Sequence, residues 1–206
     1  MNDQRSPEWF AARAGKVTAS RVADVMAKTR SGYAASRKNY MAELLCQRLT
    51  GTVEESYSNA AMQRGTELEP VARSAYEVDI GAMVQECGLI IHPTIASFGA
   101  SPDGLVGLDG LVEIKCPNTA THIDFLRSGK PDGRYLWQMA AQMACTNRDW
   151  CDFVSYDDRM PEWAQYKRVR IERNMENEAE MLSEINLFLQ ELAELEADIL
   201  KMKGAA

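Results

Sequence analysis

The spacing of the apolar residues divides the chain into three parts. From Ser6 to Val78 they recur three or four positions apart, as in Tyr40, Leu44 and Leu45, which is the period of amphipathic helices. Short runs rich in Val, Ile and Leu follow, separated by turn residues, and these runs are typical of strands. The helical period returns near the end of the chain. This order predicts helices first, then a sheet, and a long helix last.

Local signals place the ends of these elements. Ser6 as the N-cap and Pro7 in the first turn predict a helix that Gly15 interrupts. Thr18 is expected to cap the next helix. The remaining helices are expected over 36–49, 59–78, 121–126, 135–145 and 175–202. Strands are expected over 83–84, 89–91, 95–98, 105–106, 111–115, 153–156 and 166–171. A hairpin turn is expected at Asp109-Gly110 and an exposed loop over 28–33.

The predicted fold belongs to the α/β (α+β) class, with a central mixed sheet flanked by helices. A length of 206 residues corresponds to about one domain, so the whole chain, 1–206, is expected to form a single unit. Its parts are N-terminal helices over about 6–50, a core over 59–171 and a C-terminal helix over 174–203.

The composition excludes several classes of protein. Hydrophobic residues make up 46% and charged residues 26% of the chain, so extended disorder is not expected. No apolar run approaches the roughly 18 residues of a membrane span, and the polar N-terminus does not resemble a secretory signal. The five cysteines include no Cys-x-x-Cys pair, which argues against a disulfide framework or a zinc ribbon. A cytoplasmic location without membrane partners is therefore expected.

Charge is distributed unevenly along the chain. The formal net charge is −7, which taken alone disfavours a nucleic-acid partner. Between Arg13 and Arg48, however, eight basic residues face only two acidic ones, a local charge of +6, which leaves −13 for the rest. Local potential decides where a polyanion binds, so this segment is either a DNA-binding surface or a set of solvated helix faces. From Glu172 on, nine acidic and three basic residues indicate a helix that packs or faces solvent.

Candidate chemistry lies around the predicted hairpin. Because strand residues alternate between faces, Glu113 and Lys115 point to one side, and hairpin pairing can bring Asp103 beside Glu113. Two carboxylates this close favour a cation between them, and their hard oxygen atoms suit Mg²⁺ or Mn²⁺. The Lys115 ammonium could then hold a water molecule that attacks phosphorus. The pattern indicates metal-assisted phosphodiester hydrolysis, and the alternative is a surface hairpin with a salt bridge.

Two further residues can join this set. Glu69, in the predicted helix before the sheet, either supplies a third carboxylate or lies on a solvated helix face. Gln138 lies in an apolar helical segment, where an amide needs a hydrogen-bonding partner. That partner is either a group of the site or the backbone.

Five short motifs follow one another in order from residue 9 onward. They are Trp9…Arg13-x-Gly15…Thr18-Ala19-Ser20, Gly65…Glu69, Ser101-Pro102-Asp103-Gly104, Glu113-Ile114-Lys115-Cys116-Pro117 and Tyr135…Gln138. In this combination the chain resembles the lambda-exonuclease, or YqaJ-like viral recombinase, family. That family belongs to the nucleases with a PD-(D/E)xK core. The resemblance implies a restriction-endonuclease-like core, to which a long C-terminal helix is added.

The resemblance implies a role for each residue of the site. The implied metal ligands are Asp103, Glu113, Glu69 and the carbonyl of Ile114, with Glu69 serving a second metal. Lys115 would position the attacking water, and Gln138 would help to orient it. The implied catalytic residues are therefore Lys115, Glu113, Asp103, Gln138 and Glu69.

The resemblance also implies contacts with DNA. Arg13, Ser20 and Ser101 match a pocket for a 5′ phosphate, for which a guanidinium and hydroxyl groups are apt donors. Arg30 would contact the duplex ahead of the site, or it is an exposed loop residue. Met62 would wedge into the duplex end, or it packs against the helices.

The activity implied by the resemblance is a Mg²⁺-dependent 5′→3′ exonuclease. It would degrade one strand of linear double-stranded DNA to 5′-mononucleotides and leave a 3′ single strand for a strand-annealing partner protein. Two Mg²⁺ ions are implied, with Mn²⁺ as a substitute, and no iron–sulfur cluster is expected because the cysteines form no local set. The resemblance further implies a homotrimeric ring around DNA in the cytoplasm of a bacterial host, or encoded by a phage. In such a ring, basic segments would line the channel and acidic helices would face outward.

Three other functions remain open on the sequence. The first is an endonuclease on the same core, which would cut closed circular DNA. The second is a noncatalytic scaffold that binds DNA ends, although the intact Asp103, Glu113 and Lys115 argue against it. The third is a metal-dependent hydrolase of a small substrate, whose activity would depend little on salt.

Overall fold

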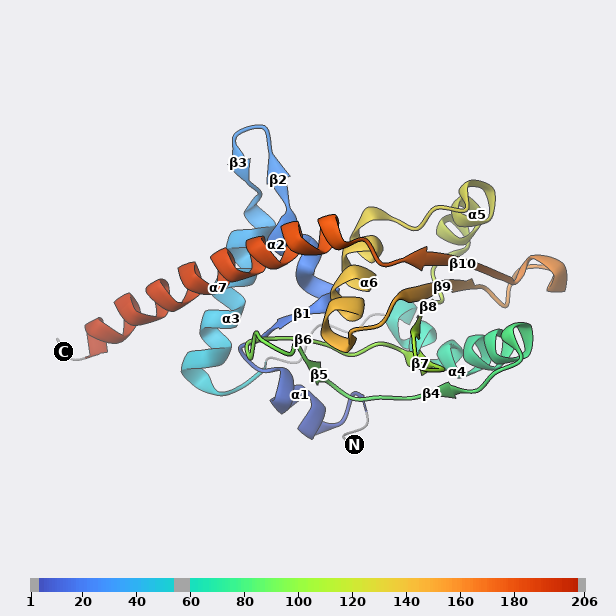
Figure 1. Cartoon of the computed structure of the whole chain (residues 1–206), viewed down its shortest axis with the longest axis horizontal. Coiled ribbons are helices and arrows are strands. Elements are labelled where there is room, and N and C mark those ends of the chain that lie inside the picture. Colours follow the sequence, from blue (N-terminus) through green and yellow to red (C-terminus); the bar gives the residue numbers. More distant parts are fainter. Residues whose placement is uncertain (1–3, 54–59, 204–206) are drawn as a thin grey trace.

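The computed structural model describes residues 4–53 and 60–203, and Figure 1 shows their arrangement. The helices are α1 (Pro7–Arg13), η1 (Ala19–Arg21), α2 (Val22–Met26), α3 (Ala35–Thr50), α4 (Ala60–Ile80), α5 (Thr119–Ser128), α6 (Gly133–Thr146), η2 (Glu162–Ala164) and α7 (Met175–Lys203). The strands are β1 (Val17–Thr18), β2 (Lys28–Thr29), β3 (Gly32–Tyr33), β4 (Val84–Gln85), β5 (Ile90–Ile91), β6 (Phe98–Ala100), β7 (Gly104–Val106), β8 (Gly110–Lys115), β9 (Trp150–Tyr156) and β10 (Tyr166–Glu172).

A mixed five-stranded sheet forms the centre of the molecule. Its strand order is β10-β9-β8-β7-β4, with β8 and β9 parallel and the other pairs antiparallel. A smaller sheet has the order β1-β6-β5, and β2 and β3 form a two-stranded hairpin. The predicted class, a mixed sheet flanked by helices with a long C-terminal helix, is confirmed. Within the described ranges, no helix has the length and apolar content that crossing a membrane requires.

The alternation of side chains along β8 decides which layer each residue meets. Val112 and Ile114 are buried in one apolar cluster with residues of α4. Leu111 is buried in a second cluster with residues of α5 and α6. Because the side-chain period of a strand is two, Glu113 and Lys115 share the face of Leu111. The sheet thus presents these two polar side chains towards α6, as the strand period predicts.

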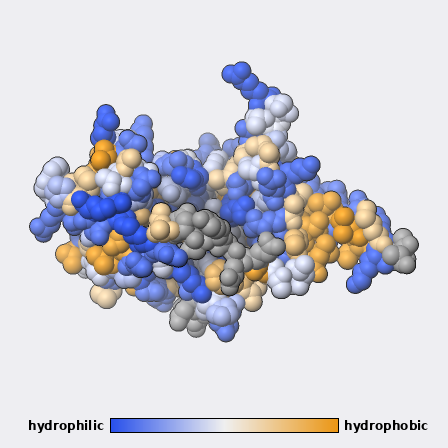
Figure 2. Space-filling model, turned by 180° about the vertical axis from the view of Figure 1, so that it is seen from behind, coloured by the Kyte–Doolittle hydropathy of each residue, from blue (hydrophilic) through white to orange (hydrophobic). Residues whose placement is uncertain are grey.

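The C-terminal helix α7 packs against the N-terminal helices. Its residues Met181, Ile185, Phe188 and Leu192 are fully buried against side chains of α2 and α3. Its far end projects beyond the rest of the chain, and hydrophobic residues gather on the surface near that end (Figures 1 and 2). The exposed apolar side chains there are Leu195, Leu200 and Met202.

Acidic residues of α7 pair with the basic N-terminal segment. Lys28 lies 2.6 Å from a carboxylate oxygen of Glu184, Arg37 lies 2.5 Å from Glu191, and Arg48 lies 3.0 Å from Glu196. The Arg37 side chain is only 5% exposed and also stacks on the Tyr33 ring. These three basic residues therefore form neither a DNA-binding surface nor a purely solvated helix face. Their charges are neutralised within the fold.

Three predicted local structures differ from the observed ones, one through a tertiary contact and two through local turns. Thr18 caps no helix through its side chain; it lies in β1, where its N–H donates to the hydroxyl of Tyr40 at 3.1 Å. The expected loop over 28–33 is the short hairpin of β2 and β3. The expected strand over 95–98 is a turn, closed by the N–H of Phe98 on the carbonyl of Ile95, and β6 begins only at Phe98.

A buried carboxylate joins three parts of the core. Asp157, directly after β9, accepts hydrogen bonds from Arg64 of α4 at 2.9 Å, from Thr119 of α5 at 2.7 Å and from Arg159 at 2.7 Å. Its side chain has no exposed surface. Burial alone would raise the pKa of Asp157, but the hydrogen bonds from Arg159 and Thr119 outweigh it and hold the pKa well below its usual range.

We predict that Asp157→Asn destabilises the protein by about 2–3 kcal/mol at pH 7, because charge-assisted hydrogen bonds to a buried group are lost. Since the folded pKa is lowered, the contribution of the carboxylate is complete above its unfolded pKa of about 3.9 and declines as the pH falls. The difference from wild type should therefore shrink by about 1 kcal/mol between pH 7 and pH 3.

Urea unfolding of both proteins at the two pH values measures this difference. Asp158→Asn is the matched control, because Asp158 pairs with the same Arg64 at a half-exposed position. A destabilisation of Asp157→Asn that is equal at both pH values would contradict the prediction.

Candidate active site

Asp103 is held at the end of β7 by the backbone of β8. Gly104 pairs with Val112 in the antiparallel ladder, so the same register places Asp103 opposite Glu113 and Pro102 opposite Ile114. Proline carries no N–H and cannot complete that ladder. The Asp103 carboxylate instead accepts the Ile114 N–H at 2.7 Å. The Pro-Asp sequence therefore places a carboxylate beside β8, as the hairpin argument predicted.

Glu113 is the most deeply buried acid of this group, with no exposed side-chain surface. Its Oε1 accepts a hydrogen bond from Nε2 of Gln138 at 2.6 Å and forms an ion pair with Lys115. Its Oε2 accepts a hydrogen bond from Nε2 of Gln142 at 2.5 Å. Three donors from two elements thus compensate the burial of one charge.

The carboxylates and the lysine act on one another electrostatically. Burial raises the pKa of Asp103, and the nearby charge of Glu113 raises it further. Burial alone would lower the pKa of Lys115, but the charges of Glu113 and Asp103 outweigh it and raise that pKa. Lys115 is therefore a cation and a hydrogen-bond donor at neutral pH, not a proton acceptor.

Glu69 forms ion pairs with two arginines. It lies on α4, where Arg73 holds its Oε1 at 2.9 Å and Arg5 holds its Oε2 at 2.6 Å. Its charge is nevertheless close enough to add to the rise in the pKa of Asp103. In the described residues, no three His, Cys, Asp or Glu side chains form a ready-made metal site. To bind a metal, Glu69 would have to release at least one of these arginines. Its role as a metal ligand stays a prediction.

The donor set of Asp103 and Glu113 fits a divalent cation. Glu113 is fully buried and Asp103 is partly buried, and the charge of Glu113 adds to the rise that burial gives to the pKa of Asp103. A hard cation would relieve that charge, and carboxylate oxygen atoms are the ligands that Mg²⁺ and Mn²⁺ prefer. The role of the Ile114 carbonyl as a metal ligand stays a prediction.

The N-terminal helix brings Arg13 to Ser101. The indole Nε1 of Trp9 donates to the Ser101 hydroxyl at 2.9 Å, and the Arg13 guanidinium lies 4.0 Å above the Trp9 ring and 3.5 Å from the same hydroxyl. Burial lowers the pKa of Arg13, and no carboxylate of the described residues pairs with it. A cation in this setting is suited to an anionic ligand.

A cavity of about 370 Å³ adjoins this group. Arg13, Ser20 and Met62 all contribute to its wall, together with Trp9. The structure therefore brings the predicted phosphate-binding residues and the predicted wedge residue to one place. The binding roles of these residues stay predictions.

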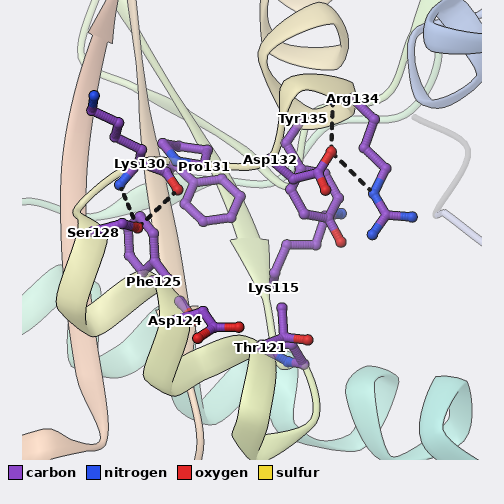
Figure 3. Close-up of a pocket in the computed structure, with 13 residues that line it drawn as sticks. Lys115, Thr121, Asp124, Phe125, Ser128, Lys130, Pro131, Asp132, Arg134 and Tyr135 are labelled. Atoms are coloured by element: carbon purple, nitrogen blue, oxygen red, sulfur yellow. Dashed lines mark hydrogen bonds and ion pairs between the residues drawn. The ribbon is translucent and has the colours of Figure 1, made fainter.

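A second cavity, of about 300 Å³, is lined in part by Lys115 (Figure 3). Lys115 extends from β8 towards the ring of Tyr135, 5.4 Å from its centroid. Residues of α5 and of the 128–134 loop complete the wall. Lys115 thus pairs with Glu113 and also lines an open space that water can enter.

Arg30 lies apart from both cavities. It occupies the turn between β2 and β3, in the hairpin that projects from the helices in Figure 1. Its side chain is exposed and makes no ion pair with the described residues. This position is compatible with both interpretations of Arg30, a contact to the duplex or an exposed loop residue.

Sequence reasoning missed two members of the site. The Trp9 indole contacts both the Arg13 guanidinium and the Ser101 hydroxyl, which lies 92 positions from Trp9 in the sequence. Gln142 is one helical turn from Gln138 and binds the same carboxylate. That spacing of four was a usable signal, because residues one helical turn apart share a face.

A mixed sheet with Asp103, Glu113 and Lys115 at the ends of β7 and β8, covered by helices, has the arrangement of the PD-(D/E)xK nucleases. Residues 8–149 match the model of the YqaJ-like viral recombinase domain. The chain belongs to the YqaJ-like viral recombinase family.

Solved structures place the chain near several exonucleases. It is similar to the alkaline exonuclease LHK-Exo from Laribacter hongkongensis, with 64% identity, a TM-score of 0.89, and coverage of 97% of this chain and 98% of the other. LHK-Exo in complex with dAMP matches equally well. A phage-related exonuclease from Haemophilus somnus 129PT shares the fold, with a TM-score of 0.69 at 14% identity, over 91% of this chain and 96% of the other. A search of curated proteins finds no match.

Proposed function

We propose that the protein is a metal-dependent exonuclease that degrades one strand of linear double-stranded DNA from its 5′ end. The observation that carries the proposal is the convergence of Asp103 and Glu113 with a protonated Lys115 on β8, the middle strand of the sheet, and at the start of β7. The 64% identity to an alkaline exonuclease over nearly the whole of both chains supports a nuclease of the same type.

In this proposal Asp103 and Glu113 hold Mg²⁺, with Mn²⁺ as a substitute and Glu69 serving a second ion. When bound, the metal supplies Lewis-acid polarisation of the scissile phosphate. Lys115 keeps its proton and donates hydrogen bonds, which orients a water for in-line attack and stabilises charge that develops on the phosphate. Gln138 shares the Oε1 atom of Glu113 with Lys115 and so lies where it can orient the same water.

In this proposal Arg13, Ser20 and Ser101 make the enzyme specific for a DNA end. The guanidinium and the hydroxyls of Ser20 and Ser101 would bind a terminal 5′ phosphate, and Met62 would press on the last base pair. These contacts address phosphate and duplex shape, so cleavage is expected to depend little on base sequence.

Assembly into a homotrimeric ring and cooperation with a strand-annealing protein are part of the proposal. The projecting end of α7 supports an assembled state, because Leu195, Leu200 and Met202 are exposed there without cover from the described chain. Exposed apolar groups of this kind are typical of contact surfaces. The pairing of α7 with Lys28, Arg37 and Arg48 leaves Arg13 and Arg30 among the basic residues still available to DNA.

Linear duplex DNA beside a closed circle tests the activity. We expect loss of linear DNA only, one strand from each 5′ end, with Mg²⁺ and none with EDTA. Lys115→Ala should lower the rate by about 100-fold or more, because a donor aimed at developing charge is lost. Gel analysis with strand-specific labels reads both results.

The same assay separates the alternatives. Cutting of the circle would indicate an endonuclease on this core. Binding of DNA ends without cleavage of either substrate, at any metal concentration, would indicate a noncatalytic scaffold.

Arg13→Gln tests the phosphate pocket. Wild type should prefer 5′-phosphoryl over 5′-hydroxyl ends, and the variant should lose that preference through a KM about 10-fold higher on phosphoryl ends, as expected for one charge-assisted hydrogen bond. Initial rates on the two kinds of end provide the measurement.

Lys38→Gln is the control, because it removes the same charge from an exposed position of the basic segment. An equal loss on both kinds of end in Arg13→Gln would show that Arg13 serves DNA binding in general rather than the 5′ phosphate.

A further inference from the structure

The two oxygen atoms of Glu113 lie in different surroundings. Lys115 and Gln138, which hold Oε1, are both partly exposed and lie at the edge of the site. Gln142, which holds Oε2 at 2.5 Å, has no exposed surface. Oε1 is therefore the oxygen atom on the side of the site, and Oε2 is the oxygen atom on the side of the core.

Helix geometry makes this division possible. Gln138 and Gln142 are four positions apart on α6, so both amides face β8 one helical turn apart. Gln138 lies beside the opening and Gln142 lies deeper, between Glu113 and β9. One helix thus supplies both a donor at the site and a donor in the core to the same carboxylate.

The side-chain amide of Gln142 has a second hydrogen-bonding partner, on β9. Its Oε1 accepts from the thiol of Cys151 on β9 at 3.8 Å, so its Nε2 is left to face Glu113. Its backbone carbonyl accepts the Thr146 hydroxyl at 2.8 Å. Burial raises the pKa of the Cys151 thiol well above its usual value, so the thiol keeps its proton and its role as donor. The orientation of the side-chain amide is therefore set by Cys151 on β9 and Glu113 on β8.

We propose that Gln142 is a positioning residue that fixes the Glu113 carboxylate so that Oε1 faces the metal ions of the reaction. The inference rests on the metal-dependent function proposed above. Gln142 touches neither solvent nor either cavity, so it acts only through Glu113. Without its amide, Oε2 becomes a buried acceptor with no donor, and the carboxylate gains freedom to turn.

A purely structural role for Gln142 gives a different expectation. A buried side chain that only fills space or joins α6 to β9 changes the free energy of unfolding when it is replaced, without changing the affinity of the folded protein for a metal. Partners that orient a metal ligand usually change metal affinity or activity by about 10- to 100-fold when they are removed. Metal affinity is therefore the decisive quantity.

The experiment measures Mn²⁺ and Mg²⁺ binding to the full chain without DNA, by isothermal titration calorimetry. Gln142→Leu keeps the size of the side chain and removes the donor. We expect its metal Kd to rise about 10- to 100-fold. The Mg²⁺ concentration for half-maximal cleavage should rise by a similar factor, while the KM for DNA ends stays near the wild-type value.

Two further variants keep the test decisive. Met139→Ala removes packing at a fully buried position of the same helix whose side chain carries no donor for Glu113, so it should lower the Tm and leave the metal Kd unchanged. Gln142→Asn keeps the amide one methylene short of Glu113 and should also raise the metal Kd. It replaces Gln142→Leu if that variant does not fold.

The outcomes separate this inference from the proposed function. Wild-type metal affinity in a folded Gln142 variant would overturn the positioning role, with the metal-dependent function of the wild type intact. A wild-type protein that binds no metal and cleaves no DNA would overturn the proposed function and, with it, the inference.

Discussion

A charged carboxylate in the interior of a protein has to be matched by donors, and the site depends on how this chain satisfies that constraint at Glu113. The residue lies in the middle of the central sheet and has no exposed surface. Its compensation requires Lys115 on its own strand and two amides from α6. The packing of α6 on β8 is thus tied to the electrostatics of the site, since moving the helix would uncover a buried charge.

The neighbouring carboxylate meets a related constraint at the backbone. Pro102 interrupts the ladder between β7 and β8, and the Asp103 side chain takes the N–H that the ladder leaves free. The acid is thereby held to the strand that carries Glu113, although the two charges repel. The geometry stores an unfavourable electrostatic arrangement that a divalent cation would relieve, which is a recurrent property of functional sites.

The distribution of charge reconciles an acidic protein with a polyanionic substrate. Acidic residues of α7 neutralise three basic residues of the N-terminal segment, so those cations stabilise the fold. Arg13 instead lies beside Trp9 and Ser101 with no carboxylate partner among the described residues. Net charge therefore says little about this protein, whereas a mostly buried cation such as Arg13, which no described carboxylate pairs with, indicates where an anion would bind.

The sequence by itself determined the features that depend on neighbours along the chain. The period of a strand placed Glu113 and Lys115 on one face, and the ordered motifs indicated the family. The Asp-Gly signal located the hairpin, although its turn spans 107–109 and Gly110, in β8, already pairs with Val106. Only the tertiary structure decided that Arg5 and Arg73 hold Glu69, that Trp9 joins Arg13 to Ser101, and that Gln142 supports Glu113. Arg73 and Glu69 are one helical turn apart, as are Trp9 and Arg13, but Arg5 and Glu69, Trp9 and Ser101, and Gln142 and Glu113 are far apart in the sequence and no local period relates them. Their meeting depends on how whole helices pack on the sheet, which the packing of the entire core determines.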